Sequence, residues 1–272
     1  MSEAQEFERI KNHFFKPENE NRSEVKPRMI FCFSSPGAGK TTSIKPILLE
    51  SFNEHKPVVL EIDELKAFME NPLDTNRVKQ HFLNCLQKAF EEKRSLIIFR
   101  QRNMLEPNLT KSIFNDAKAN GYETQVTFLA LDKKRSRLGM IYRYENALKK
   151  AVESKEMDIA NYPRKPEFMK HYIFFKMIPI VAAACNKSKN IDIINVYDRE
   201  GSLLAENNRI NKTKIGNGIV NAIYRERHRK WTDLEADKFN RRRNEAENSM
   251  AARASNLMEK IKFKLFTRAF NR

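Results

Sequence analysis

The residues of this chain that are best suited to chemistry lie between Ser34 and Thr42, directly after an apolar stretch. They match the pattern GxxxxGK followed by Ser or Thr, except that a serine replaces the first glycine. In such a loop, backbone N–H groups enclose phosphate oxygens, the lysine reaches the β- and γ-phosphates, and the next hydroxyl ligates Mg²⁺. The sequence therefore predicts ATP and Mg²⁺ as cofactors. The predicted cofactor-binding residues are Ser35, Gly37, Ala38, Gly39, Lys40, Thr41 and Thr42, with Thr41 as the metal ligand.

A carboxylate follows the second apolar run, where residues 58–62 predict a strand and Asp63 comes directly after it. Doubly wound sheets bind ligands at the carboxyl ends of their strands, so Asp63 is expected near the loop. There it could accept the proton of an attacking hydroxyl or hold Mg²⁺ through water. The alternative is that Asp63 only caps the helix beginning near Leu65, and we favour the catalytic role. Glu61 and Glu64 are expected to point elsewhere.

Apolar, β-branched runs alternate with segments of helical spacing along most of the chain. This alternation favours parallel strands joined by helical crossovers, so the sequence predicts an α/β, P-loop kinase-like three-layer fold with a mainly parallel sheet. A C-terminal helical extension follows it. The predicted strands are 29–33, 58–62, 96–99, 125–131 and 191–197, and the predicted helices are 41–53, 78–93, 107–120, 136–154 and 168–186.

Composition limits the compartment and the partners. The 272 residues include no apolar run of about 18 residues, so no membrane span is expected, and the acidic N-terminus does not resemble a secretory signal. Three cysteines, each within an apolar stretch, are expected to be buried free thiols, which favours a cytoplasmic protein. A net charge of +16 favours contact with polyanions such as nucleic acid, an acidic protein or phosphorylated metabolites.

Arginines can stabilise the charge that builds up during phosphoryl transfer, and their sequence contexts distinguish the candidates. Recognisable motifs surround them in a fixed order: SSPGAGKTT, IDELK, NGYETQVTFLAL, Ser136 followed by Arg143-Tyr144-Glu145, Arg164 with His171, and a last strand leading into residues 196–201. In this ordered set the sequence resembles the zeta-toxin family over residues 25–206. The candidate arginines are Arg102, Arg143 and Arg164.

The resemblance implies a P-loop kinase of a bacterial toxin–antitoxin system. Such kinases phosphorylate an amino-sugar hydroxyl of UDP-N-acetylglucosamine, and their toxicity follows from blocked use of cell-wall precursors. The resemblance also implies that Lys40 binds ATP and takes part in catalysis, that Asp63 is the base, and that Arg143 and Arg164 lie near the transferred phosphate. The implied substrate-binding residues are Asp63, Lys66 and Arg102.

Two departures from the family pattern concern the acceptor. Lys66 stands where the family has an arginine. Its compact ammonium group therefore replaces a planar guanidinium that can bind two oxygen atoms at once. Residues 98–102, at the third predicted strand, lack the acid, glycine and threonine that usually precede the family's arginine. The acceptor therefore stays open between a UDP-N-acetyl amino sugar, another metabolite and a polynucleotide 5′-hydroxyl. The alternative to an enzyme is a non-catalytic, nucleotide-gated module that binds nucleic acid.

The last part of the chain is disproportionately basic, with 14 Lys/Arg and 7 Asp/Glu in residues 222–272. Residues 219–229 and 234–270 predict charged helices, and apolar residues at helical spacing favour docking on the core or on a partner. An acidic antitoxin would suit this charge, and the basic tail could also bind nucleic acid. The predicted divisions are an N-terminal helical segment (1–24), a kinase domain (25–215) and a basic helical extension (216–272). The apolar residues of the tail are Leu257, Ile261, Leu265 and Phe266.

Overall fold

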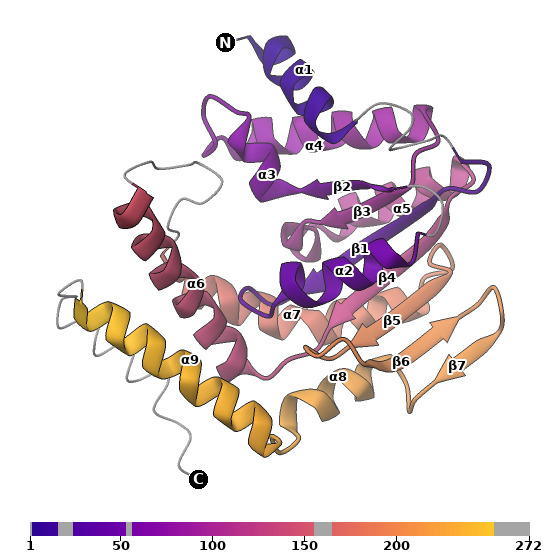
Figure 1. The fold of residues 1–272 in the computed structure, drawn as a ribbon. Helices are drawn as coiled ribbons and strands as arrows, with labels where there is room; N and C mark the ends of the chain where they lie inside the picture. Colours follow the sequence, from indigo (N-terminus) through magenta and orange to yellow (C-terminus); the bar gives the residue numbers. More distant parts are fainter. Residues whose placement is uncertain (1, 16–23, 53–55, 155–164, 253–272) are drawn as a thin grey trace.

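The computed structural model describes residues 2–15, 24–52, 56–154 and 165–252, which form an α/β fold (Figure 1). The strands are β1 (Arg28–Ser34), β2 (Val58–Glu61), β3 (Leu96–Phe99), β4 (Glu123–Leu129), β5 (Ile193–Tyr197), β6 (Leu203–Asn208) and β7 (Thr213–Ile215). The helices are α1 (Glu3–Phe14), η1 (Lys40–Ile44), α2 (Lys45–Glu50), α3 (Ile62–Ala67), α4 (Thr75–Glu91), η2 (Gln101–Leu105), α5 (Pro107–Ala119), α6 (Lys133–Ser154), α7 (Phe168–Lys187), α8 (Ile219–His228) and α9 (Asp233–Ala252).

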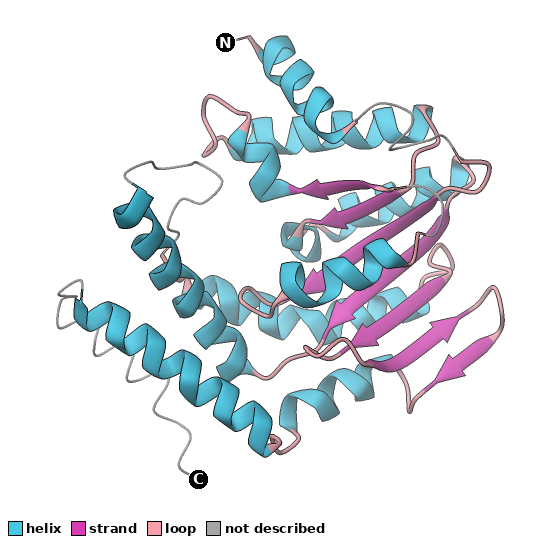
Figure 2. Cartoon of the chain, in the orientation of Figure 1, coloured by secondary structure: helices cyan, strands magenta, loops and turns pink. Residues whose placement is uncertain are grey.

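A single sheet with strand order β2-β3-β1-β4-β5-β6-β7 carries the fold (Figure 2). The five strands from β2 to β5 pair in parallel, which confirms all five predicted strands and the mainly parallel sheet. The antiparallel pair β6–β7 was not predicted. Apolar and polar residues alternate only weakly in both strands, because β6 ends in polar residues and the three residues of β7 are all exposed. Neither strand therefore produces a periodic apolar signal.

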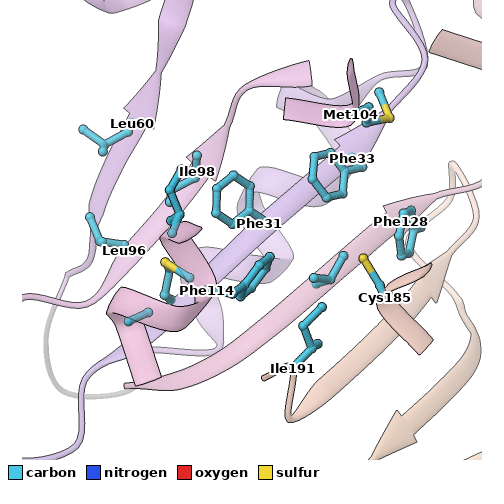
Figure 3. Packing of buried hydrophobic residues seen from close by; sticks show 14 of the residues in the cluster. Phe31, Phe33, Leu60, Leu96, Ile98, Met104, Phe114, Phe128, Cys185 and Ile191 are labelled. Atoms are coloured by element: carbon cyan, nitrogen blue, oxygen red, sulfur yellow. The ribbon is translucent and has the colours of Figure 1, made fainter. Parts of the chain in front are cut away.

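Helices cover both faces of the sheet, and β1 shows how the sequence achieves this. All but the first of its residues are buried, as expected for a central parallel strand. Phe31 and Phe33 point into the larger core with Phe114 and Phe128, under α4, α5 and α7 (Figure 3). Ile30 and Cys32, which alternate with these phenylalanines, point to the opposite face, which η1 and α2 cover. Successive residues of a strand face opposite sides, so one apolar run serves two cores.

Several helix bounds differ from the predictions. The expected helix 41–53 is divided into η1, a π-helical turn, and α2. The expected helix 136–154 begins earlier, at Lys133, because the Asp132 carboxylate accepts hydrogen bonds from the N–H groups of Lys134 and Arg135, both at 2.9 Å. Helix α9 agrees with the predicted tail helix as far as Ala252, and the tail residues Leu257, Ile261, Leu265 and Phe266 lie outside the described part of the chain.

Helix α7 is long and apolar enough to cross a membrane, judged by length and composition alone, and no other helix in the described ranges is. The sequence had predicted no such segment. One side of α7 is buried, with His171, Phe174 and Ile178 among its inward residues, and it packs against β1, β4 and α8. This is the arrangement of a core helix. All three cysteines are buried and free, as predicted, and burial raises the pKa of each thiol to about 12.

Candidate functional site

The glycine-containing loop lies between β1 and η1, at the carboxyl edge of the sheet. Gly37 has φ +77° and Gly39 has φ +99°, so both occupy the left-handed region that favours glycine. Gly39 caps η1, and its carbonyl accepts hydrogen bonds from the N–H groups of Thr42 (3.1 Å) and Ser43 (2.8 Å). The first N–H groups of a helix have no acceptor within it. The loop therefore has the backbone form of an anion site.

Close packing on α6 gives Gly37 a second reason to be glycine. A Cβ at Gly37 would lie 2.6 Å from the amide nitrogen of Met140 and would overlap the carbonyl oxygen of Ser136. A Cβ at Gly139 of α6 would overlap the carbonyl oxygen of Gly37. The two backbones touch directly, so the loop is positioned by α6 as well as by β1. The sequence pattern gave no sign of the role of Gly139.

Replacing Gly139 with alanine tests this contact. Helix propensity alone predicts that the change stabilises α6 by about 0.5–1 kcal/mol. Overlap with the Gly37 carbonyl predicts the opposite, a loss of about 1–3 kcal/mol in the free energy of unfolding. Urea denaturation of both proteins measures the difference. A more stable Gly139→Ala protein would show that the loop and α6 do not touch in solution.

Lys40 and Thr41 come directly after Gly39, as the loop pattern requires. The ammonium group of Lys40 lies 4.5 Å from the ring centroid of Phe99, at the end of β3. This cation–π contact holds the half-buried lysine at the edge of the sheet where the loop lies. Thr41 is exposed, and the hydroxyl of Thr42 donates to the Gly39 carbonyl at 3.2 Å. The predicted phosphate-binding groups are thus at one place.

Three carboxylates lie at the end of β2. Asp63 is exposed in the first turn of α3, which begins directly after the strand. The expectation that Glu61 and Glu64 point elsewhere is wrong. Lys45 of α2, the helix that follows the loop, forms ion pairs with Glu61 at 3.2 Å and with Glu64 at 3.6 Å. These contacts tie the end of β2 to the loop's helix, and they bring the Asp63 turn to the same edge of the sheet.

The third-strand element contains a buried arginine that the sequence reasoning passed over. Arg100 is 4% exposed, and its guanidinium donates to Asn103 and Glu106, both at 2.6 Å. Arg102, the predicted substrate contact, is exposed and donates to Glu106 at 3.0 Å. The two arginines lower the pKa of Glu106, although desolvation by burial, the largest contribution, acts to raise it. In this structure Arg102 is paired within its own turn, while Arg100 organises η2.

The remaining predicted residues are distributed between α3 and α6. Lys66 is half-buried near the end of α3, and Arg143 is exposed on α6. Arg164 lies outside the described residues. On α6, Ser136 Oγ lies 2.7 Å from Nε2 of the buried His171 on α7, so these two motif residues are in contact. Burial, together with the nearby charges of Arg137, Lys133 and Arg227, lowers the pKa of His171 to about 3.

A neutral, buried His171 makes stability depend on pH. The ordinary pKa is 6.5, so below it the unfolded chain binds a proton that the folded protein does not bind, and stability falls as the pH falls towards 3. Wild type should lose about 1.3 kcal/mol between pH 7 and 5.5 from this group. His171→Gln should lack that loss. Urea denaturation at both pH values measures it, and equal pH dependence in the two proteins would contradict the burial of a neutral imidazole.

Sequence and structure comparisons agree with this geometry. A glycine loop between the central strand and a helix, in a mainly parallel sheet covered on both faces, defines a P-loop kinase-like protein. The family model described as zeta toxin matches residues 11–210 of the chain. The chain belongs to the zeta toxin family and is kinase-like.

A solved structure has the same fold. It comes from the characterisation of the PezAT chromosomal toxin–antitoxin system of the human pathogen Streptococcus pneumoniae. The two chains share 17% sequence identity with a TM-score of 0.69, and the match covers 91% of this chain and 100% of that one. At this identity the likeness concerns the fold. A search of curated proteins found no match to this chain.

Proposed function

We propose that this chain transfers the γ-phosphate of ATP to a hydroxyl of a UDP-N-acetyl amino sugar such as UDP-N-acetylglucosamine. The main support is the loop between β1 and η1, where two left-handed glycines, a helix start and Lys40 come together. Membership of the zeta toxin family supports the same reaction type. Interference with cell-wall precursors is the proposed basis of toxicity.

In this mechanism the loop binds the polyphosphate and Lys40 contacts the β- and γ-phosphates. Thr41 would hold Mg²⁺, which would supply positive charge to the polyphosphate. The Thr41 hydroxyl is exposed directly after the loop lysine, which fits a ligand of an ion beside the polyphosphate. Asp63 accepts the proton of the attacking hydroxyl, and Arg143 and Arg164 stabilise the transferred phosphate.

The acceptor is the least constrained part of the proposal. Lys66 and Arg102 are the proposed sugar-nucleotide contacts, together with Asp63. Arg102 is exposed and already paired with Glu106, so it has to exchange this partner for a substrate oxygen. This observation favours a second candidate, the same phosphotransferase with another metabolite or a polynucleotide 5′-hydroxyl as acceptor. A cytoplasmic location, an acidic antitoxin and nucleic-acid binding through the basic tail remain predictions.

An acceptor screen tests the reaction. The protein is incubated with Mg²⁺, ATP labelled in the γ-phosphate, and separate acceptors: UDP-N-acetylglucosamine, other UDP-sugars and oligonucleotides with 5′-hydroxyls. A phosphorylated UDP-N-acetyl sugar is the expected product, detected by mass spectrometry. Asp63→Asn should lower its rate by about 10²- to 10⁴-fold, since the amide cannot accept the proton. ATP hydrolysis without any phosphorylated sugar would overturn the sugar assignment, and label on an oligonucleotide would favour the second candidate.

A further inference from the structure

Besides Lys40, a second cationic group lies beside the loop, and no sequence pattern singled it out. Arg199 follows β5, and its Nε lies 3.5 Å from the position that a Cβ on Gly39 would occupy. The same position is 3.5 Å from Thr42 Oγ1 and 3.3 Å from Ser43 Oγ. The Arg199 guanidinium therefore lies at the start of η1, where the loop's N–H groups are found, although 160 residues separate Arg199 from Gly39 in sequence.

The turn that carries Arg199 is fixed by hydrogen bonds and by packing. The Asp198 N–H donates to the Ser202 carbonyl at 3.0 Å, and the Ser202 N–H donates to the Asp198 carboxylate at 2.8 Å. Gly201 has φ +91°, and a Cβ there would lie 2.6 Å from Ile47 Cδ1 of α2. The turn thus rests against the helix that follows the loop, and this contact directs Arg199 toward the loop.

Arg199 is a cation without a partner among the described residues. It forms no hydrogen bond or ion pair with any of them. Burial, followed by the charges of Arg242 and Arg135, lowers the pKa of Arg199 to about 10, while Glu200 and Asp132 act in the opposite direction. The side chain therefore stays charged at neutral pH in surroundings that already carry positive charge.

The like charge that lowers the pKa of Arg199 most belongs to Arg242, on the C-terminal helix α9. Arg135 is 5% exposed and bonded to three carboxylates, Asp132, Glu226 and Glu235, so its charge is compensated. Arg242 of α9 has no such compensation among the described side chains, and its guanidinium lies 5.7 Å from the ring centroid of Tyr142 on α6.

Packing between α6 and α9 places Arg242 beside Tyr142. The two helices lie side by side (Figure 1) and share an apolar cluster, which consists of Leu138, Ile141, Phe239, Ala246 and Met250. Because α6 also touches the loop through Gly139, the helix pair forms a rigid connection from α9 to the phosphate-binding loop. Helix α9 lies beyond residues 11–210, which the family model matches.

We propose that Arg199 and Arg242 form a second cationic wall of the nucleotide site and bind the polyphosphate of ATP. The charges of Arg199 and Arg242 oppose one another unless an anion lies between them, and a polyphosphate supplies that negative charge. Planar guanidiniums bind phosphate oxygens in pairs, whereas the Lys40 ammonium acts as a point charge. The C-terminal basic helix thereby becomes part of the nucleotide site. The inference rests on the proposed function only in taking ATP as the ligand.

Equilibrium binding of ATP with Mg²⁺, measured by calorimetry on the full chain, tests whether Arg199 and Arg242 bind the polyphosphate. Arg199→Gln should raise the Kd for ATP by about tenfold or more, and Arg199→Lys should recover part of the loss. Arg242→Gln should raise it by about three- to tenfold. Arg241→Gln is the matched control, because Arg241 is the exposed neighbour of Arg242 on the same helix and the charge change is identical. Unfolding midpoints identify any variant that is misfolded.

The outcomes separate this inference from the proposed reaction. Tight ATP binding by wild type, with weaker binding by Arg199→Gln and Arg242→Gln but not by Arg241→Gln, supports the wall even if no acceptor is phosphorylated. If Arg199→Gln and Arg242→Gln bind ATP as tightly as Arg241→Gln, the wall is overturned, even when the wild type proves to be a kinase. Equal weakening by Arg241→Gln would indicate a general charge effect and would also overturn it.

Discussion

Replacing Lys40 with alanine should lower phosphoryl transfer by about 10²- to 10³-fold while leaving the fold intact. The ammonium group is held at the sheet edge by the Phe99 ring, 4.5 Å away, so it is already near the loop before any nucleotide binds. Prior positioning makes a charged donor effective, because no reorganisation is needed as charge develops on the phosphate. The loss should appear mainly in kcat, since the loop's N–H groups still bind the polyphosphate.

The measurement is of kcat and KM separately, with labelled ATP and the acceptor that the screen identifies. Lys170→Ala serves as the control, because Lys170 is an exposed lysine in the first turn of α7 that pairs with Glu167 just before the helix. Its rate should equal that of wild type. Thermal unfolding of Lys40→Ala should stay within a few degrees of wild type, since the lysine has no ion pair in the described structure. If Lys40→Ala retained a third of the wild-type activity, the proposed role of Lys40 in phosphoryl transfer would be wrong.

Replacing Arg135 with alanine should lower the free energy of unfolding by about 3–5 kcal/mol. Arg135 is 5% exposed and donates to Asp132, Glu226 and Glu235, with Trp231 stacked 5.4 Å from its guanidinium. Removing it leaves Asp132 without the ion-pair partner that it has in this structure, and leaves Glu226 and Glu235 with Arg229. Breaking a buried network on one side is costly because the remaining charges are not solvated.

The network joins the start of α6 to α8 and α9, so its loss should first loosen the C-terminal helices. Urea denaturation followed by Trp231 fluorescence reports on this region, since this tryptophan is the only one in the chain. Arg225→Ala is the matched control, as Arg225 is an exposed arginine on α8 and should change stability by less than about 0.5 kcal/mol. Similar stabilities for Arg135→Ala and Arg225→Ala would show that the ion network contributes little.

The sequence predicted structure best where a short, continuous stretch of residues carries the whole signal. The strand at Arg28–Ser34 is an uninterrupted apolar run, and the loop after it combines glycines with Lys40 at a spacing that few other structures require. The five parallel strands and the phosphate-binding loop could therefore be predicted from the sequence. The strand β7 could not, because three residues are too few for a periodic pattern.

Contacts between distant segments could not be read from the chain. Nothing in the residues around Gly139 reveals that its hydrogen occupies the space next to the Gly37 carbonyl. The composition of η2 does not show that Arg102 is paired with Glu106, and no spacing rule places Arg199 beside Gly39. Each of these depends on how α6 and the turn after β5 pack around β1.

The sequence by itself determined the kind of protein, because residues 34–42 contain the phosphate-binding pattern except for its first glycine, and adjacent strands determine its surroundings. Only the tertiary structure decided which cations share that loop. A chain of +16 offers many arginines of similar local context, and the packing of α9 on α6 brings Arg242 toward Arg199. Charge interactions depend on distance in space, which the order of residues does not specify when the partners lie on separate helices and strands.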